Sequence, residues 1–195
     1  MIPTLTDPMG LSFTGRQLQY IESTGAQYIN TGIAPDFAGG DSIAIRFYSA
    51  AYTGAAPCVF GSRESGVRNG VYCLAGSGLI AADSAGYSSI AIQVAQGEHT
   101  LSISDTSVVN DGTSYTMPRR VTCGLPIFLF ALNNYGTGTF GIYNGMRLYD
   151  WKYWRNGTLA QHLIPVLDRS GVPCLYDTVT RTLIYNAGTG TFNYA

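Results

Sequence analysis

Carboxylates and histidines are the side chains of this chain that could do acid–base chemistry, but their number and spacing do not favour it. Glycoside hydrolysis needs two carboxyl groups about 5–9.5 Å apart across a cleft. The sequence has only three glutamates, and none has a second acid two residues away: Glu22, Glu64 and Glu98. Asp150, Asp168 and Asp177 lie near predicted turns, where aspartate commonly bends and caps the backbone. The sequence therefore does not predict a glycosidase.

The two histidines, His99 and His162, lie on predicted strands. Neither accompanies a Gly-x-Ser-x-Gly nucleophile elbow, the turn that exposes the serine of many hydrolases. We therefore interpret both as structural residues whose hydrogen bonds are satisfied. The Gly-Thr-Gly-Thr run at Gly188–Thr191 ends a hairpin and opens no helix, so it does not predict a phosphate-binding loop. Together these patterns predict a protein that is not an enzyme.

Calcium is the metal ion that the loops could best hold, because it takes oxygen ligands from loop residues. Asp36 and Asp41 flank Gly39–Gly40, and Asp105 and Asp111 flank another loop. Neither pair approaches the density of acids in an EF-hand loop. We predict turn-forming aspartates, no metal site and no cofactor, with Ca²⁺ at these loops as the alternative.

The many aromatic side chains allow two interpretations, core and ligand binding. Tyr149, Trp151 and Tyr153 would share one face of a predicted strand from Arg147 to Arg155, because side chains alternate across a strand. Saccharides stack on such rings, but aromatic residues also dominate protein cores. We predict that this face is core, with a saccharide platform as the alternative. Exposed saccharide contacts are predicted on loops instead, at Tyr52, Arg63, Arg68, Tyr87, Asn133, Asn134 and Tyr135.

The composition indicates a globular domain with an unusually uncharged surface. Of the 195 residues, 46% are hydrophobic and only 12% are charged, and the net charge is −1. So few charges do little to keep copies apart, and we expect a homo-oligomer or a larger assembly. There is no basic patch of the kind that binds nucleic acid, and no apolar run approaches the ~20 residues of a membrane span.

The four cysteines are far apart in the sequence: Cys58, Cys73, Cys123 and Cys174. They lack the closely spaced pairs that ligate zinc. The first ten residues lack the basic and apolar regions of a signal peptide, which predicts synthesis in a reducing cytoplasm. We therefore expect free, mostly buried thiols, with a disulfide as the alternative.

Turn residues divide the chain into about a dozen short predicted strands. Ser42–Tyr48 alternates cleanly between apolar and other residues. Asn156-Gly157 and Asp111-Gly112 supply the positive-φ positions of tight hairpin turns. Two further pairs of neighbouring runs are predicted to associate: Gln19–Glu22 with Gln27–Ile33, and Ser89–Ala95 with Glu98–Ser104. Pro126–Leu132 predicts one central strand buried on both faces, and Ser62–Asn69 predicts an exposed loop. Helix should be minimal.

This spacing of turns between short strands predicts an all-β protein, an antiparallel β-sandwich or jelly roll, over residues 19–195. Residues 1–18 contain prolines and glycines without periodicity, so they predict an extended N-terminal arm. Its apolar side chains are predicted to bind a partner: Ile2, Leu5, Met9, Leu11 and Phe13.

Several motifs also resemble a known family. They are YIESTGAQYINTGI at Tyr20–Ile33, LFALNN at Leu129–Asn134, and the closing frame IPV.D..G..CLYD followed by IYNAGTGTF up to Phe192. The chain is similar here to laminin-G-like, or concanavalin A-like, domains of tailed phages and prophages, which usually belong to tail, fibre or other virion-surface proteins. The resemblance implies a jelly roll whose opening strand pairs with the closing one, bringing Tyr28 and Ile29 near Tyr185 or Phe192.

The same resemblance implies a virion protein made in the cytoplasm of a host bacterium. We expect a non-enzymatic role in capsid decoration, in a tail or in a fibre, with other virion proteins as partners of the arm. A host-surface glycan is the second expected partner. A free carbohydrate-binding, lectin-like module is the alternative function.

Overall fold

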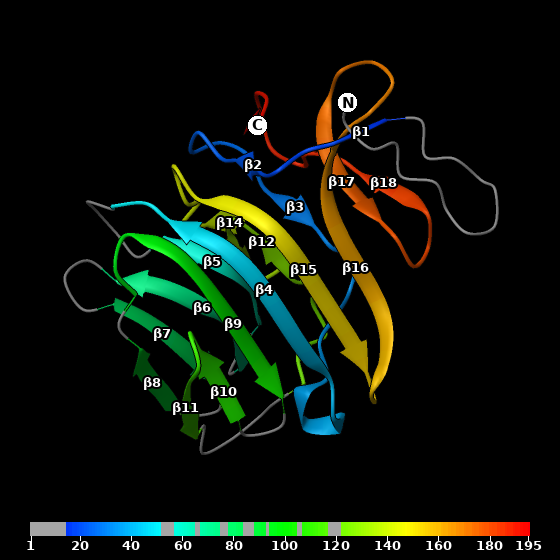
Figure 1. Cartoon of the computed structure of the whole chain (residues 1–195). Coiled ribbons are helices and arrows are strands. Elements are labelled where there is room, and N and C mark those ends of the chain that lie inside the picture. The colour runs from blue at the N-terminus through cyan, green and yellow to red at the C-terminus, as the bar shows by residue number, and fades with distance from the viewer. Residues whose placement is uncertain are drawn as a thin grey trace.

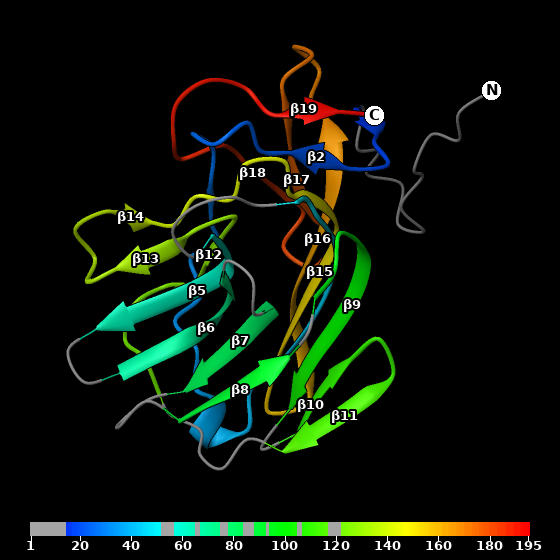
Figure 2. The same ribbon diagram turned by 90° about the vertical axis from the view of Figure 1, so that its left-hand side faces the viewer.

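The computed structural model describes residues 15–51, 57–64, 67–74, 78–83, 88–92, 94–104, 107–116 and 122–195. Two large sheets, which we call sheet A and sheet B, pack face to face (Figures 1 and 2). The helical structure in these residues is one turn of 3₁₀ helix, η1 (Phe37–Gly39). The predicted all-β sandwich with minimal helix is confirmed.

Sheet A is the larger layer, and Figure 1 views its outer face. Its main path is β11 (Thr113–Thr116), β10 (Ser107–Asn110), β9 (Gly97–Ser104), β4 (Ser42–Ser49), β15 (Arg147–Arg155), β16 (Thr158–Leu167), β17 (Pro173–Asp177) and β18 (Thr182–Ile184). Three short strands complete it: β1 (Arg16–Gln17) beside β16, and β2 (Ile21–Glu22) between β15 and β19 (Asn193–Tyr194). All of these pairs are antiparallel.

Sheet B follows the path β14 (Thr139–Phe140), β13 (Leu132–Asn134), β5 (Cys58–Glu64), β6 (Val67–Leu74), β7 (Gly78–Asp83) and β8 (Ser88–Ile92). β12 (Phe128–Leu129) also pairs with β5 and with β3 (Ile29–Asn30). β13 runs parallel to β5, whereas the other named strand pairs are antiparallel. This parallel pair places consecutive residues of β5 and β13 side by side at one edge of the sandwich.

The core lies between the two sheets and is built by strand alternation. Ile43, Ile45 and Phe47 of β4 are almost completely buried, as the alternating pattern predicted. Trp151 of β15 meets Phe60 of β5 with their ring centroids 5.3 Å apart, so these two side chains join sheet A to sheet B. The prediction that the aromatic face of β15 is core is confirmed for Trp151 and Tyr153, which are both fully buried.

Tyr149 departs from the predicted alternation because β15 contains a β-bulge. Leu148 pairs with Phe47 and Asp150 pairs with Arg46, so Tyr149 is an extra residue in the ladder. Leu148 therefore joins the core, while the Tyr149 ring lies on the outer face of sheet A under Arg46. The prediction that Tyr149 shares a face with Trp151 and Tyr153 is wrong. Asp150 was also predicted near a turn, and it lies in the middle of β15.

Two predicted hairpin turns are confirmed. Asn156 and Gly157, with φ of 48° and 78°, connect β15 to β16. Asp111 and Gly112, with φ of 48° and 80°, connect β10 to β11 in the same way. Positive φ at both central residues matches the right-handed twist of the flanking strands, which favours Asn-Gly and Asp-Gly.

Two predicted strand pairings are wrong because the chain changes sheets between the strands. β2 lies in sheet A and β3 in sheet B, so Gln19–Glu22 does not pair with Gln27–Ile33. Likewise β8 lies in sheet B and β9 in sheet A, so Ser89–Ala95 forms no hairpin with Glu98–Ser104. Alternation identifies a strand and its buried face, but it does not identify the partner strand.

Two further expectations are corrected in the same way. Pro126–Leu132 is not one central strand, because Phe130 adopts a φ of 68° and separates β12 from β13. Ser62–Asn69 is not one exposed loop, since its two ends extend β5 and β6. Ser62 is fully buried and Arg63 is half-buried.

The two ends of the sandwich meet as the resemblance implied. β2 pairs with β19, and Ile29 forms an isolated bridge with Asn186. Leu18 is buried in the core, and β1 pairs with β16, so the described residues 15–18 lie against the sandwich. The predicted arm residues lie outside the described part of the chain: Ile2, Leu5, Met9, Leu11 and Phe13.

Three cysteines are buried thiols, which agrees with the expectation: Cys58, Cys123 and Cys174. The side chain of Cys73 lies outside the described part. Within the residues described, no helix is long and apolar enough to cross a membrane.

Candidate ligand-binding site

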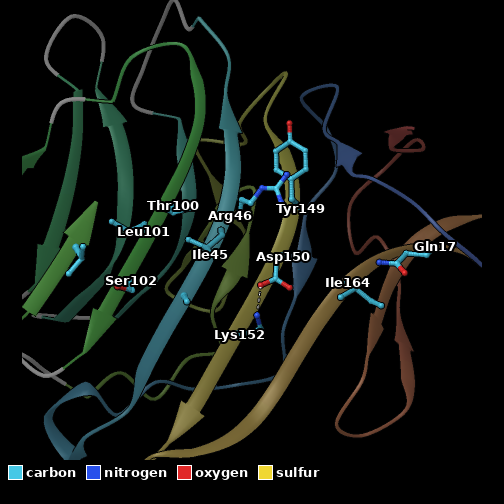
Figure 3. Close-up of a pocket in the computed structure, with 12 residues that line it drawn as sticks. Gln17, Ile45, Arg46, Thr100, Leu101, Ser102, Tyr149, Asp150, Lys152 and Ile164 are labelled. Carbon is cyan, nitrogen blue, oxygen red and sulfur yellow. Dashed lines mark ion pairs between the residues drawn. The ribbon is translucent and has the colours of Figure 1, made fainter. Parts of the chain in front are cut away.

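A groove of about 520 Å³ crosses the outer face of sheet A (Figure 3). Its lining comes from β1, β9, β4, β15, β10 and β16: Gln17, Thr100, Leu101, Ser102, Ala44, Ile45, Arg46, Tyr149, Asp150, Lys152, Val109 and Ile164. Strand alternation turns most of these side chains outward. Ile45 and Leu101 are the exceptions, because both are buried in the core between outward neighbours. Figure 3 shows Arg46, Asp150 and Lys152 in succession along the centre of the groove.

Asp150 is the central charge of the groove. Its carboxylate lies 3.0 Å from the Lys152 Nζ and 2.7 Å from the His162 Nε2. Burial opposes ionisation of Asp150, but the hydrogen bonds from His162 and Lys152 outweigh it, so the pKa of this carboxyl is lowered. Asp150 is therefore a fixed hydrogen-bond acceptor with a donor on each side.

Arg46 is held over the groove by an aromatic ring. Its guanidinium lies 4.6 Å from the centroid of the Tyr149 ring, and one nitrogen lies 3.5 Å from Glu98. Burial raises the pKa of the Tyr149 hydroxyl, and a hydrogen bond to Glu98 raises it further. The ring is only 8% exposed, so Tyr149 positions Arg46 and offers little surface of its own.

A second arginine continues this polar surface past the end of the groove. The Arg147 guanidinium lies between the rings of Tyr20 and Tyr48, at 4.6 and 4.9 Å from their centroids. It also pairs with Glu22 at 2.5 Å. Tyr20 packs edge-on against Tyr149, with centroids 5.8 Å apart. The stacked arginines and tyrosines therefore form one continuous face over β4 and β15.

The line from Asp150 through His162 to Thr178 resembles the acid–histidine–hydroxyl order of a hydrolase. The His162 Nδ1 lies 3.1 Å from the Thr178 hydroxyl. However, the Thr178 N–H donates to the His162 carbonyl, and the Val179 N–H donates to Asp177. Neither N–H is free to form an oxyanion hole beside the hydroxyl. This line is structural, as predicted for His162.

The other acid–base candidates are also occupied in structural contacts. His99 lies between Asp111, at 2.6 Å, and the Ala95 carbonyl, at 2.8 Å. Asp168 accepts the N–H groups of Ser170 and Val172, and Asp177 accepts those of His162 and Val179: these two aspartates cap turns, as predicted.

The predicted calcium loop around Asp36 has a structural explanation. Asp36 caps η1 by accepting the Gly39 N–H. Asp41 is buried, accepts the Asp36 N–H and the Tyr153 hydroxyl, and lies 3.8 Å from Arg155. Asp105 lies outside the described part. Among the residues described, no group of three or more His, Cys, Asp or Glu could hold a metal ion.

The predicted saccharide-contact residues do not line the groove. Tyr52 and Tyr87 lie outside the described residues, as does the side chain of Arg68. The remaining four come together where β13 pairs with β5 in sheet B: Arg63, Asn133, Asn134 and Tyr135. We call this place the β5–β13 edge. The Tyr135 ring is 49% exposed there, and the Arg63 guanidinium lies 4.7 Å from its centroid.

Sequence reasoning missed the residues at the centre of the groove. The alternation of Ser42–Tyr48 already placed Arg46 outward, and Lys152 is the only lysine in the chain. No sequence signal indicated that a bulge would place Tyr149 beside them.

No protein-family model matches this chain, and no curated protein shows significant similarity to it.

Proposed function

We propose that this chain is a non-enzymatic, saccharide-binding β-sandwich that serves in adhesion or assembly at the surface of a phage or prophage virion. The observation that carries the binding role is the groove on sheet A, where Arg46, Asp150 and Lys152 present charged hydrogen-bonding groups in a row. The virion setting is supported by the closing motifs, IPV.D..G..CLYD and IYNAGTGTF.

The order of donors and acceptors favours a hydroxyl-rich ligand. Arg46 and Lys152 only donate, Asp150 only accepts, and the Thr100 and Ser102 hydroxyls do both. A sugar hydroxyl also does both, so vicinal hydroxyls match this alternation. Hydrogen bonds to charged groups contribute roughly 1.5–3 kcal/mol each.

The charges of the groove favour a neutral glycan over a strongly acidic one. Arg46 is paired with Glu98, and Lys152 with Asp150, so the positive charges are already balanced. An acidic ligand would meet the Asp150 carboxylate between the two cations. The lowered pKa of Asp150 also suits a hydrogen-bond acceptor, whereas a general acid for glycoside cleavage needs a raised one.

Binding to immobilised neutral glycans tests the groove. The matched variants are Arg46→Met and Asp150→Asn in the groove, with Arg181→Met in the β17–β18 turn as the control. We expect the wild type and Arg181→Met to bind the same glycans, and each groove variant to lose at least tenfold in affinity. No reducing ends should be released. Equal binding by all four proteins would remove the groove from consideration.

Incorporation into particles tests the virion role separately. Deletion of residues 1–15 should leave a folded domain with a cooperative melting transition that no longer joins the particle. Incorporation of the truncated chain at the wild-type level would assign the contact to the sandwich. A full-length chain that binds glycans but never enters particles would favour the free lectin-like module.

A further inference from the structure

We propose that the β5–β13 edge of sheet B is a second ligand site, and that it takes the acetamido group of an N-acetylated amino sugar. This inference does not rest on the groove, which lies on the other sheet. It rests on hydrogen-bonding groups of Arg63 and Asn134 that have no partner among the residues the structure describes.

Arg63 and Asn134 are neighbours across the parallel strand pair. They are register partners of β5 and β13. The Arg63 Nε and the Asn134 Oδ1 are both buried, and neither forms a hydrogen bond within the described part of the chain. Among the described residues, no carboxylate forms an ion pair with Arg63. The residue with an unpaired donor and the residue with an unpaired acceptor are therefore neighbours on adjacent strands.

Such pairs of atoms are uncommon, because an unpaired buried polar group destabilises the folded protein. Within the described part, two further buried side-chain atoms lack a hydrogen-bond partner, on Ser62 and Asn110. The Ser62 hydroxyl contacts the Cys123 thiol, which is a weak hydrogen-bonding partner. This contact lowers the pKa of Cys123, although burial raises that pKa by more. Among the described residues, the unpaired Asn110 oxygen stands alone, whereas Arg63 and Asn134 are register partners that bring a donor and an acceptor to one place. This pairing of a donor with an acceptor is why we assign the two atoms to a ligand.

Asn133 shows what a structural asparagine looks like at the same place. Its Nδ2 donates to the Pro126 carbonyl at 2.9 Å, and its Oδ1 accepts the Gly136 N–H at 3.1 Å. Both ends of this amide are satisfied within the protein. Asn134, the next residue, leaves its Oδ1 unpaired, so the two neighbours have different roles.

Tyr135 provides the surface that would receive the sugar ring. Its ring is half-exposed and lies over the Arg63 guanidinium, while its N–H donates to the Arg63 carbonyl at 2.8 Å. The two unpaired atoms are buried, and the Tyr135 ring stacked on Arg63 is the exposed group beside them. A stacked contact at an exposed site is weak, so the ring is free to adjust to a ligand.

The chemistry of the two atoms identifies the ligand group. A donor beside an acceptor is complementary to an amide, whose carbonyl accepts and whose N–H donates. An acetamido carbonyl would accept from the Arg63 Nε–H, and its N–H would donate to the Asn134 Oδ1. Its methyl group and the sugar ring would then contact the Tyr135 ring.

Titration by NMR with N-acetylglucosamine tests this site, with glucose as the matched sugar that lacks the acetamido group. We expect N-acetylglucosamine to shift the resonances of Asn134 and Tyr135 and to bind at least tenfold more tightly than glucose. Arg63→Met and Asn134→Leu should each reduce that affinity at least tenfold. Arg181→Met, in the β17–β18 turn away from both regions, should leave it unchanged.

Thermal melting of the same variants separates a binding role from a structural one. Arg63→Met and Asn134→Leu remove an unpaired buried group, so the melting temperature should stay constant or rise. Asn133→Leu breaks two satisfied hydrogen bonds, so its melting temperature should fall. The proposal is overturned if Arg63→Met and Asn134→Leu melt as early as Asn133→Leu. It is equally overturned if N-acetylglucosamine gives no shifts at this edge, or if glucose shifts the Asn134 and Tyr135 resonances as strongly.

Discussion

The groove on sheet A and the β5–β13 edge of sheet B both combine arginine with tyrosine. They differ in that polar side chains of the groove have partners within the protein, whereas two buried polar atoms at the edge have none among the described residues. In the groove, Asp150 has partners on both sides, and Arg46 is held by a ring and a carboxylate. At the β5–β13 edge, Arg63 and Asn134 leave buried atoms unpaired. A paired site keeps its geometry without ligand, whereas an unpaired site is stabilised by ligand.

The two regions nevertheless share one support in the core. Phe60 lies three residues before Arg63 on β5, and Trp151 follows Asp150 on β15. Their rings meet edge to face between the sheets. Changes in this contact should therefore affect both regions, and changes outside it should affect only one.

Trp151→Ala should have the largest effect. Trp151 is fully buried and donates to the Gln161 side chain at 3.2 Å, so its removal leaves a cavity and an unpaired acceptor. We expect a loss of roughly 3–5 kcal/mol in the free energy of unfolding, measured by denaturant titration. Ligand binding should weaken at both sites, whereas Trp151→Phe should retain more of it. Loss of binding at one site alone would show that the two do not share this support.

Asp150→Leu should have the next largest effect and should separate the two regions. It leaves His162 and Lys152 without their common acceptor, so the free energy of unfolding should fall by about 1–3 kcal/mol. Asn134→Leu, a change of similar size at the other site, should not lower it. Equal losses for both variants would remove the contrast between a paired and an unpaired site.

The lowered pKa of Asp150 predicts how the stability of the folded protein changes with pH. The pKa of Asp150 is lower in the folded protein than the ordinary value near ~4. Its contribution to stability is therefore present above pH ~4 and is lost as the pH falls through the folded pKa. We expect Asp150→Asn to flatten the acid limb of a melting-temperature profile between about pH 5 and 2. A profile parallel to that of the wild type would contradict the pairing.

Sequence patterns predicted local features better than long-range ones. The Asn156-Gly157 turn, the inward face of β4 and the buried aromatics of β15 follow from positive φ and alternation, which are properties of a few adjacent residues. The partners of β2 and β8 depend on where the chain crosses between sheets. No short motif records that crossing, so both predicted pairings failed.

The candidate sites show the same division. The predicted residues Arg63, Asn133, Asn134 and Tyr135 do come together, but only because β13 runs parallel to β5. The sequence offered no reason to expect that pair in an antiparallel fold. In the groove, the bulge at Tyr149 moved one ring to the outer face, and a bulge changes the register without an unusual residue type.

Two glycine substitutions should sharpen the comparison by acting on one region each. Gly157 has a φ of 78° in the turn between β15 and β16, which carry Asp150 and His162. Gly136 has a φ of 69° in the turn beside Tyr135. Valine at either position should cost on the order of 1–2 kcal/mol, because a β-branched residue disfavours positive φ.

We expect Gly157→Val to weaken glycan binding in the groove and to leave N-acetylglucosamine binding unchanged. Gly136→Val should do the reverse, since its Cβ would also approach Leu125 at 3.2 Å. Denaturant titration measures the loss in the free energy of unfolding, and the two binding assays show which region each substitution affects. An unchanged stability for Gly157→Val would show that the hairpin tolerates a side chain at positive φ.

The smallest effect should come from the ion pair at the outer end of the groove. The side chains of Arg46 and Glu98 are 49% and 53% exposed, and their closest atoms are 3.5 Å apart. Water screens such a pair, so a double-mutant cycle of Arg46→Met and Glu98→Gln should give a coupling free energy below about 1 kcal/mol. Arg46→Met should still reduce glycan affinity at least tenfold, because the ligand meets the guanidinium on its exposed side. A coupling as large as that between Asp150 and His162 would instead make Arg46 part of the rigid centre, and its loss of binding would then reflect a disturbed groove.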